Sequence, residues 1–152
     1  MIYVCPLKRV DETIAKIGAD RVISLLSVGT MMERPAAIRD GNHLLINMHD
    51  IAEAQDGMTL PGAEHVRRIL DFAQGWNRSR PLVVNCYAGV SRSTATAYLL
   101  AAALNPRRDE TELARTLRNL SPTATPNPRI IALADGILDR KGHMISAIAA
   151  IG

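Results

Sequence analysis

The sequence is poor in cysteine, in aromatic residues and in long apolar runs, and each shortage excludes a class of protein. Two cysteines among 152 residues cannot form the disulfide framework that stabilises many small secreted domains. Only 3% of the residues are aromatic and the basic residues are scattered, which argues against a nucleic-acid partner. The longest apolar stretch, Ala97 to Leu104, is too short to span a bilayer, so we expect no membrane partner.

The N-terminus lacks the features of a secretory signal. Met1 leads directly into apolar residues, with no basic residue before them and no cleavage signal behind them. Together with the scarcity of cysteine, this predicts a protein of the reducing cytoplasm. The net charge of +3 is compatible with an anionic substrate without identifying one, and the sequence leaves the oligomeric state open.

Apolar residues make up 47% of the chain, which predicts one globular domain over residues 1–152. Runs rich in Val, Ile and Leu predict strands at Tyr3–Cys5, Arg21–Leu26, Leu44–Met48 and Leu82–Val84. Helical spacing or capping residues predict helices over Val10–Ile17, Ala63–Trp76 and Ser93–Leu104, then one opening at Asp109 and one at Asn127. Strands that alternate with helices indicate the α/β class, with a mainly parallel sheet of four or five strands flanked by helices.

Two details of the C-terminal half complete this outline. The helix that opens after Asp109 carries Leu113, Leu117 and Leu120, which we expect to face the core as one stripe. The tail from His143 to Gly152 is small and apolar, and its pattern predicts no particular structure.

The segment Leu82 to Leu100 combines features that favour anion binding. An apolar strand runs into a short loop that begins with Cys86, contains Gly89 and ends at Arg92, and an apolar helix follows at once. Such a junction directs the amides of the loop and of the helix N-terminus toward one point, where they can surround a phosphate. We therefore predict a phosphate cradle, whose amides come from Tyr87, Ala88, Gly89, Val90 and Ser91.

Three side chains give this cradle its chemistry. Cys86 faces the converging amides, which stabilise a thiolate and make it a nucleophile. Arg92 carries a planar guanidinium that can hold two phosphate oxygens at once. Ser93 follows, and its hydroxyl can donate a hydrogen bond to the sulfur, which makes the sulfur a better leaving group.

The stretch from Cys86 to Ser93 resembles the signature of the cysteine-based protein tyrosine phosphatase superfamily. That signature is a cysteine, five residues, an arginine and a serine or threonine, and the ending Ser91-Arg92-Ser93 is most similar to the dual-specificity branch. Pro126-Asn127 resembles the Pro-Asn opening of a late helix in that branch. The resemblance implies a phosphatase-like fold and hydrolysis of phosphate monoesters through a phosphocysteine intermediate.

The resemblance also implies a general acid and exposes one departure. Relatives use an aspartate on a mobile loop after an earlier strand, and here the loop His49–Pro61 offers Asp50, which we favour, and Asp56. Asp56-Gly57 is also an ordinary turn dipeptide.

Relatives usually have histidine immediately before the cysteine, whereas this chain has Asn85. An asparagine can still donate hydrogen bonds, so we expect activity, with a thiol less acidic than in those relatives.

No cofactor is expected, because Arg92 and the amides supply the charge stabilisation. The four histidines show no metal-ligand spacing, so we expect no metal site. The expected substrates are phosphoproteins, bearing phosphotyrosine or phosphoserine/threonine, or small phosphoesters. Phosphoinositide phosphatases of this superfamily often carry lysines in the loop, where this chain has Tyr87 and Val90.

Two alternatives stay open at this stage. The first is a catalytically weak phosphate-binding module of the same fold, which Asn85 leaves possible. The second is a thiolate enzyme that reduces arsenate or transfers sulfur. Gly89 and Ser93 argue against the second alternative, and Cys5 is the only other cysteine that could resolve an intermediate.

Overall fold

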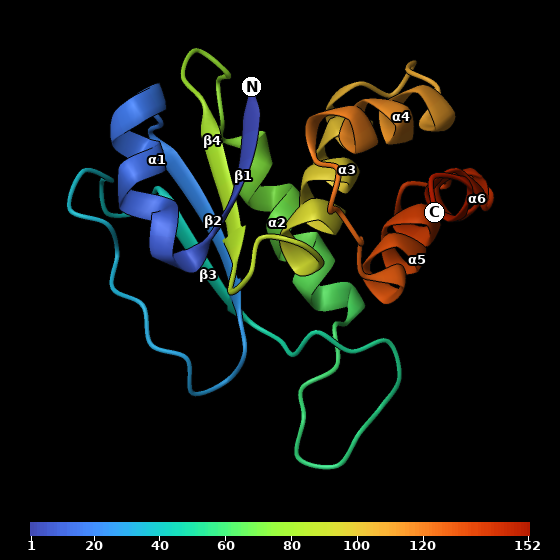
Figure 1. Cartoon of the computed structure of the whole chain (residues 1–152), viewed down its shortest axis with the longest axis horizontal. Coiled ribbons are helices and arrows are strands. Elements are labelled where there is room, and N and C mark those ends of the chain that lie inside the picture. Colours follow the sequence, from blue (N-terminus) through green and yellow to red (C-terminus); the bar gives the residue numbers. More distant parts are fainter.

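Four short parallel strands form one sheet in the order β1-β4-β2-β3, in a computed structural model that describes residues 1–152 (Figure 1). The strands are β1 Ile2–Pro6, β2 Arg21–Leu26, β3 His43–Asn47 and β4 Leu82–Cys86. The predicted α/β class, with a mainly parallel sheet of four or five strands, is confirmed, and the sheet has four strands, all parallel. Strand β4 extends two residues beyond the predicted Val84, so Cys86 is the last residue of an interior strand.

Six α-helices surround the sheet, and the sequence predicted five of them. They are α1 Val10–Ile17, α2 Ala63–Gln74, α3 Arg92–Leu104, α4 Glu110–Leu120, α5 Pro128–Ile137 and α6 His143–Ala150, with a one-turn 3-10 helix at Leu7–Arg9. Gly18 ends α1 in the left-handed conformation, at φ 70°, and Asp109 and Asn127 cap α4 and α5 as expected. No helix of the structure is both long and apolar enough to cross a membrane.

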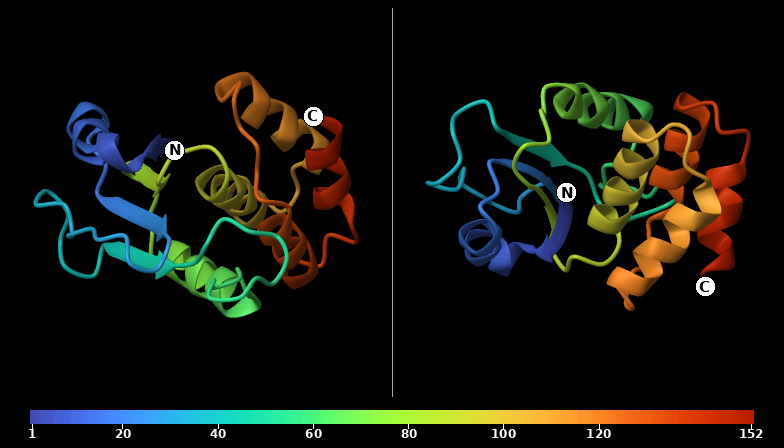
Figure 2. Two further views of the ribbon diagram at one scale, coloured as in Figure 1. Left: turned by 60° about the horizontal axis from the view of Figure 1, so that its bottom comes forward. Right: turned by 90° about the horizontal axis from the view of Figure 1, so that it is seen from above.

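The two faces of the sheet are covered unequally. Helix α1 lies on one face, while α2 and α3 cover the other and α4, α5 and α6 pack beyond them (Figure 2). Residues alternate between the faces: Val83 packs in the small cluster beside α1, whereas Val84 and Cys86 belong to the large core. The side chain of Asn85 therefore points toward the α1 face, opposite to that of Cys86.

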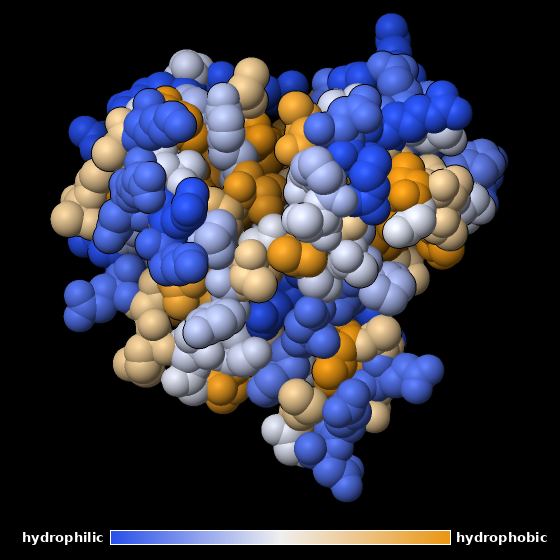
Figure 3. Space-filling view, viewed as in Figure 1, coloured by the Kyte–Doolittle hydropathy of each residue, from blue (hydrophilic) through white to orange (hydrophobic).

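All four strands end at the same edge of the sheet, and the functional segments follow from that edge. The loop after β4 turns there, beside the long loops after β2 and β3, which hang at the bottom of Figure 1. The tip of the loop after β3 contains Glu53 and Asp56, both exposed, and projects as a mainly hydrophilic lobe in Figure 3. The carboxyl edge of a parallel sheet is where such domains bind their ligands.

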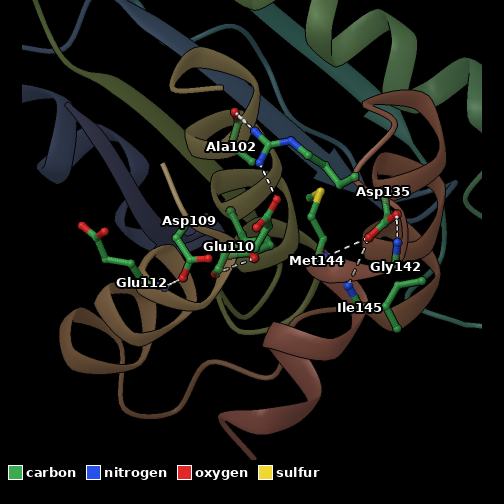
Figure 4. Close-up of polar contacts among 10 residues, drawn as sticks. Ala102, Asp109, Glu110, Glu112, Asp135, Gly142, Met144 and Ile145 are labelled. Carbon is green, nitrogen blue, oxygen red and sulfur yellow. Dashed lines mark hydrogen bonds and ion pairs between the residues drawn. The ribbon is translucent and has the colours of Figure 1, made fainter. Parts of the chain in front are cut away.

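Buried polar groups join the C-terminal helices to one another (Figure 4). Arg140 forms a 2.8 Å ion pair with Glu110, and both side chains are nearly buried. Asp135 is 4% exposed and accepts hydrogen bonds from the backbone N–H groups of Gly142, at 2.8 Å, and Met144, at 2.9 Å. Asp135 of α5 thereby caps α6, a helix with no capping side chain of its own.

The prediction that Leu120 faces the core as part of the apolar stripe of α4 is wrong. Leu113 is 5% exposed and Leu117 packs against the core, but Leu120 is 81% exposed. Leu120 is the final residue of α4, so no following turn of the helix shields its side chain.

We predict that Asp135→Ala lowers the free energy of unfolding by about 2 kcal/mol, because it leaves buried N–H groups at the start of α6 without acceptors. Denaturation with urea measures this change. Asp71→Ala removes an exposed carboxylate from α2 and should change stability by less than ~0.5 kcal/mol. Equal stability of the two variants would contradict the capping role.

Candidate active site

The loop between β4 and α3 turns its carbonyl groups outward. The carbonyl oxygen of Tyr87 accepts from Leu7 N at 3.1 Å, that of Val90 from Thr125 N at 3.0 Å, and that of Ser91 from Asn127 N at 3.2 Å. None of the N–H groups from residue 87 to residue 91 donates to a backbone carbonyl or a side-chain oxygen. The amides of Gly89 and Val90 instead bond to the sulfur of Cys86, as an anion cradle requires.

Gly89 makes the tight course of this loop possible. Its φ of +74° lies in the left-handed region, which side chains other than hydrogen disfavour. A Cβ atom at this position would lie 2.7 Å from Pro6 N and 2.8 Å from Cys5 C. The cradle thus rests directly on the backbone at the end of β1, and the contact leaves no room for a methyl group.

The thiol of Cys86 lies inside the cradle and is 2% exposed. Burial is the largest influence on its pKa and raises it, but hydrogen bonds from the Ser93 hydroxyl and from the N–H groups of Ser93, Val90 and Gly89 together outweigh burial. The pKa of Cys86 therefore lies below its ordinary value. Ser93 Oγ stands 3.1 Å from Cys86 Sγ. The other thiol, Cys5, has its pKa raised, chiefly by burial.

Arg92 begins α3 and is held by one edge of its guanidinium. Its Nη1 donates to Met48 O at 2.8 Å and to Ser27 Oγ at 3.1 Å, which ties it to the ends of β3 and β2. The side chain is buried, and its Nε has no hydrogen-bond partner in the protein. Since guanidinium binds oxyanions through two parallel N–H groups, the Nε–Nη2 edge is the one left for a phosphate.

Of the two candidate acids, the structure brings Asp50 to the cradle. Its Oδ1 accepts from Ser91 Oγ at 2.7 Å and from Asn127 Nδ2 at 2.9 Å. Asp56 lies in an exposed turn with Gly57, and its carboxylate makes no hydrogen bond or ion pair within the chain. The geometry favours Asp50 as the acid, an assignment that stays a prediction.

The loop that carries Asp50 is closed at its neck. His49 N donates to Thr59 O at 2.8 Å, and Thr59 N donates to His49 Nδ1 at 2.8 Å. On the other side of Asp50, Ile51 O accepts from Asn127 Nδ2 at 3.1 Å. The residues before and after Asp50 are therefore both fixed, and His49 serves the loop's own structure through Nδ1.

Asn85 is joined to a histidine on another strand. Its Oδ1 accepts from Ser24 Oγ at 2.6 Å, and Ser24 Oγ lies 2.9 Å from His43 Nε2. The Ser24 hydroxyl donates to Asn85, whose Nδ2 is buried without a hydrogen-bond partner in the protein. Burial, followed by the nearby charge of Arg34, lowers the pKa of His43. The residue immediately before Cys86 is thus linked by hydrogen bonds across β2 to a histidine of β3.

Sequence reasoning missed Ser27 and Ser24 and assigned Asn127 only as a helix cap. Ser27 follows the last residue of β2, and Ser24 lies within that strand. Their closeness to the β4 loop depends on β2 and β4 being neighbours in the sheet, which local pattern does not reveal. Asn127 was visible through the Pro126-Asn127 motif, but its contact with Asp50 spans 77 positions in sequence.

No protein-family model matches the sequence, and no curated protein sequence matches it. Solved structures do match. DUSP15 superposes with a TM-score of 0.72 at 15% identity, over 98% of this chain and 90% of that one. The PTP-2 phosphatase of Cydia pomonella gives a TM-score of 0.69 at 18% identity, over 89% of this chain and 84% of that one.

A third similar structure is the human tyrosine phosphatase-like serine/threonine/tyrosine-interacting protein. It gives a TM-score of 0.70 at 12% identity, over 92% of each chain. Identities this low establish the fold alone. The chain has the fold of the cysteine-based, dual-specificity-like phosphatases, and the resemblance drawn from Cys86 to Ser93 is confirmed at that level.

We predict that Gly89→Ala abolishes oxyanion binding, because the new methyl group would overlap the backbone of Cys5 and Pro6. Gly57→Ala is a matched control: its φ is also +74°, but nothing lies within 4 Å of the added Cβ. Calorimetric titration with tungstate measures binding to each variant. Retention of binding in Gly89→Ala would show that the loop does not need this close approach.

We predict that Ser93→Ala raises the pKa of Cys86, because the thiolate loses a hydroxyl donor. The rate of iodoacetamide alkylation should then rise with pH at a higher midpoint than in the wild type. Thr96→Val is the control, since the Thr96 hydroxyl bonds only to Arg92 O within α3. Coincident profiles for Ser93→Ala and wild type would refute the role of this hydroxyl.

Proposed function

We propose that this protein hydrolyses phosphate monoesters, with Cys86 as the nucleophile. The observation that carries the proposal is the convergence of the Gly89, Val90 and Ser93 N–H groups and the Ser93 hydroxyl on one sulfur, which lowers the pKa of Cys86 despite its burial. A field that stabilises a thiolate also stabilises the equatorial oxygens of a transferring phosphoryl group. A cysteine with only a packing role would need none of these donors.

The proposed reaction has two steps. In the first, the sulfur of Cys86 bonds to phosphorus as the bond from phosphorus to the leaving oxygen breaks, and Asp50 gives a proton to that oxygen. In the second, water attacks phosphorus and gives a proton to Asp50, and the phosphorus–sulfur bond breaks to restore the thiolate. Arg92 and the amides of residues 87–91 hold the phosphoryl oxygens, and Ser93 donates to the departing sulfur.

A phosphate-binding module without turnover is the second candidate, and one observation favours it. A protein described as tyrosine phosphatase-like and as an interacting protein shares this fold at a TM-score of 0.70. Binding would need the amides and Arg92, whereas turnover also needs an ionised Cys86 and an acid at the cradle. The contacts of Asp50 and Ser93 with the cradle support the enzyme over the module.

Arsenate reduction and sulfur transfer have less support from the site than hydrolysis of phosphate monoesters. Resolution of a thiolate intermediate within the chain, as an arsenate reductase can use, needs a second thiol, and Cys5 is the only candidate. Cys5 belongs to the cluster beside α1, whereas Cys86 belongs to the core on the opposite face of the sheet. Burial also keeps Cys5 protonated by raising its pKa.

The substrate class that we propose is a phosphoprotein or a small phosphoester. The structure of PTPMT1 in complex with PI(5)P shares the fold, at 12% identity over 98% of this chain and 94% of that one, with a TM-score of 0.68. The loop of this chain carries no lysine that would favour a polyanionic headgroup, so we retain phosphoproteins. We further propose a single domain in the cytoplasm, where both cysteines stay reduced.

The proposal predicts that the wild type hydrolyses an aryl phosphate and that Cys86→Ser does not, with a loss of at least about 10³-fold in kcat, while both proteins bind tungstate. Cys5→Ser is the matched control and should keep its activity. Steady-state release of phosphate measures turnover, and calorimetry measures binding. Turnover in Cys86→Ser similar to wild type would refute the mechanism, and binding without turnover in the wild type would favour the module.

A further inference from the structure

The carboxylate of Asp50 is held by only one of its two oxygens. Oδ1 accepts from both Ser91 Oγ, at 2.7 Å, and Asn127 Nδ2, at 2.9 Å, whereas Oδ2 makes no hydrogen bond with the protein. Asn127 is 2% exposed, so its amide cannot turn to water instead. This asymmetry distinguishes the two oxygens chemically.

The orientation of the Asn127 amide is fixed by its role as a cap. Its Oδ1 accepts from the N–H groups of Arg129 and Ile130, both at 3.0 Å, and only an oxygen can accept there. The atom directed at Asp50 must therefore be Nδ2, which can donate and cannot accept. The usual ambiguity between the two ends of an asparagine side chain does not arise at this position.

A permanent donor on Oδ1 decides where a proton can reside on Asp50. A proton on Oδ1 would point toward the N–H of Asn127, so that two hydrogens would meet. The Ser91 hydroxyl would then compete with Asn127 for the lone pair that remains on Oδ1. A proton on Oδ2 meets no such conflict, because Oδ2 has no protein partner. The acidic proton therefore belongs on Oδ2, the oxygen left free for substrate.

We infer that Asn127 and Ser91 are positioning residues that place the acidic proton of Asp50 on Oδ2 and aim it at the leaving group. The inference rests on the proposed function and specifies its acid step. As the bond from phosphorus to the leaving oxygen breaks and the sulfur of Cys86 bonds to phosphorus, the Oδ2 proton moves to that oxygen. In the second step, Oδ2 takes a proton from the attacking water, and the thiolate departs.

The same contacts couple the acid to the rest of the site. Ser91 belongs to the cradle, and its backbone carbonyl accepts from Asn127 N at 3.2 Å, so cradle, acid and α5 meet at one residue pair. Asn127 Nδ2 also donates to Ile51 O at 3.1 Å, which fixes the backbone beyond Asp50. Loss of the Asn127 side-chain amide would therefore misplace the acid without removing any donor to Cys86.

The test compares two substrates that differ in their need for an acid. Phenyl phosphate has a leaving group that must be protonated, whereas 2,4-dinitrophenyl phosphate has one that need not be. Asn127→Ser keeps an acceptor for the N-terminus of α5 but is too short to reach Asp50. It should lower kcat/KM about tenfold for phenyl phosphate and less than about threefold for the dinitrophenyl ester.

Two further variants distinguish misplacement of the Asp50 carboxylate from a general disturbance of the fold. Ser91→Ala removes the other donor, and although Ser91 is the N-cap residue of α3, its side chain makes no capping hydrogen bond, so the variant should show the same dependence on the leaving group. Asp109→Ser makes a matched change to the cap of α4, away from the cradle, and should change neither rate. In an Asp50→Ala background, Asn127→Ser should cause no further loss of kcat/KM for phenyl phosphate, because the carboxylate that Asn127 positions is absent.

The outcomes distinguish this inference from the proposed function. Equal losses on both substrates, or a full additional loss in the Asp50→Ala background, would overturn the positioning role while leaving the phosphatase intact. A wild type without Cys86-dependent turnover on either ester would overturn the proposed function itself. The inference would be supported if Asn127→Ser and Ser91→Ala both lower kcat/KM more for phenyl phosphate than for the dinitrophenyl ester, and if this difference disappears in the Asp50→Ala background.

Discussion

Buried or confined peptide N–H groups need acceptors, and the loop after β4 is built so that the protein supplies almost none. Its carbonyl groups are taken by Leu7, Thr125 and Asn127, which come from three different parts of the chain. The N–H groups of Gly89 and Val90, together with that of Ser93, bond to the sulfur of Cys86, and the lowered pKa of the thiol follows from this geometry.

The surroundings of the loop consist mainly of residues that hold other residues in place. Met48 and Ser27 fix one edge of Arg92, Asn127 fixes Asp50, and Ser24 fixes Asn85. These supports come from the ends of neighbouring parallel strands and from the start of α5, which the topology gathers at one edge of the sheet. The departure at Asn85 fits this pattern, because the amide is fully buried and linked through Ser24 to His43.

Local signals predicted most of the elements and the loop that joins β4 to α3. The run from Cys86 to Ser93 is contiguous, and the caps Asp109 and Asn127 act on amides two or three positions away, so a short window of sequence contains the whole interaction. Long-range contacts were not predictable in this way. The start of α6 is capped by Asp135 of the preceding helix, so its own residues carry no starting signal. The exposure of Leu120 depends on where packing stops, which periodicity does not encode.

The order β1-β4-β2-β3 has a consequence for how the chain acquires its structure. Strand β1 pairs only with β4, so the first segment to be synthesised has no partner until residues 82–86 have been made. Strand β4 must then enter between β1 and β2, a non-local pairing of the kind that slows folding. Because Gly89 rests on the end of β1, this same event closes the sheet and completes the cradle. A nascent or partly unfolded chain therefore lacks the shaped loop, and the donors that lower the pKa of Cys86 converge only once β4 is in place.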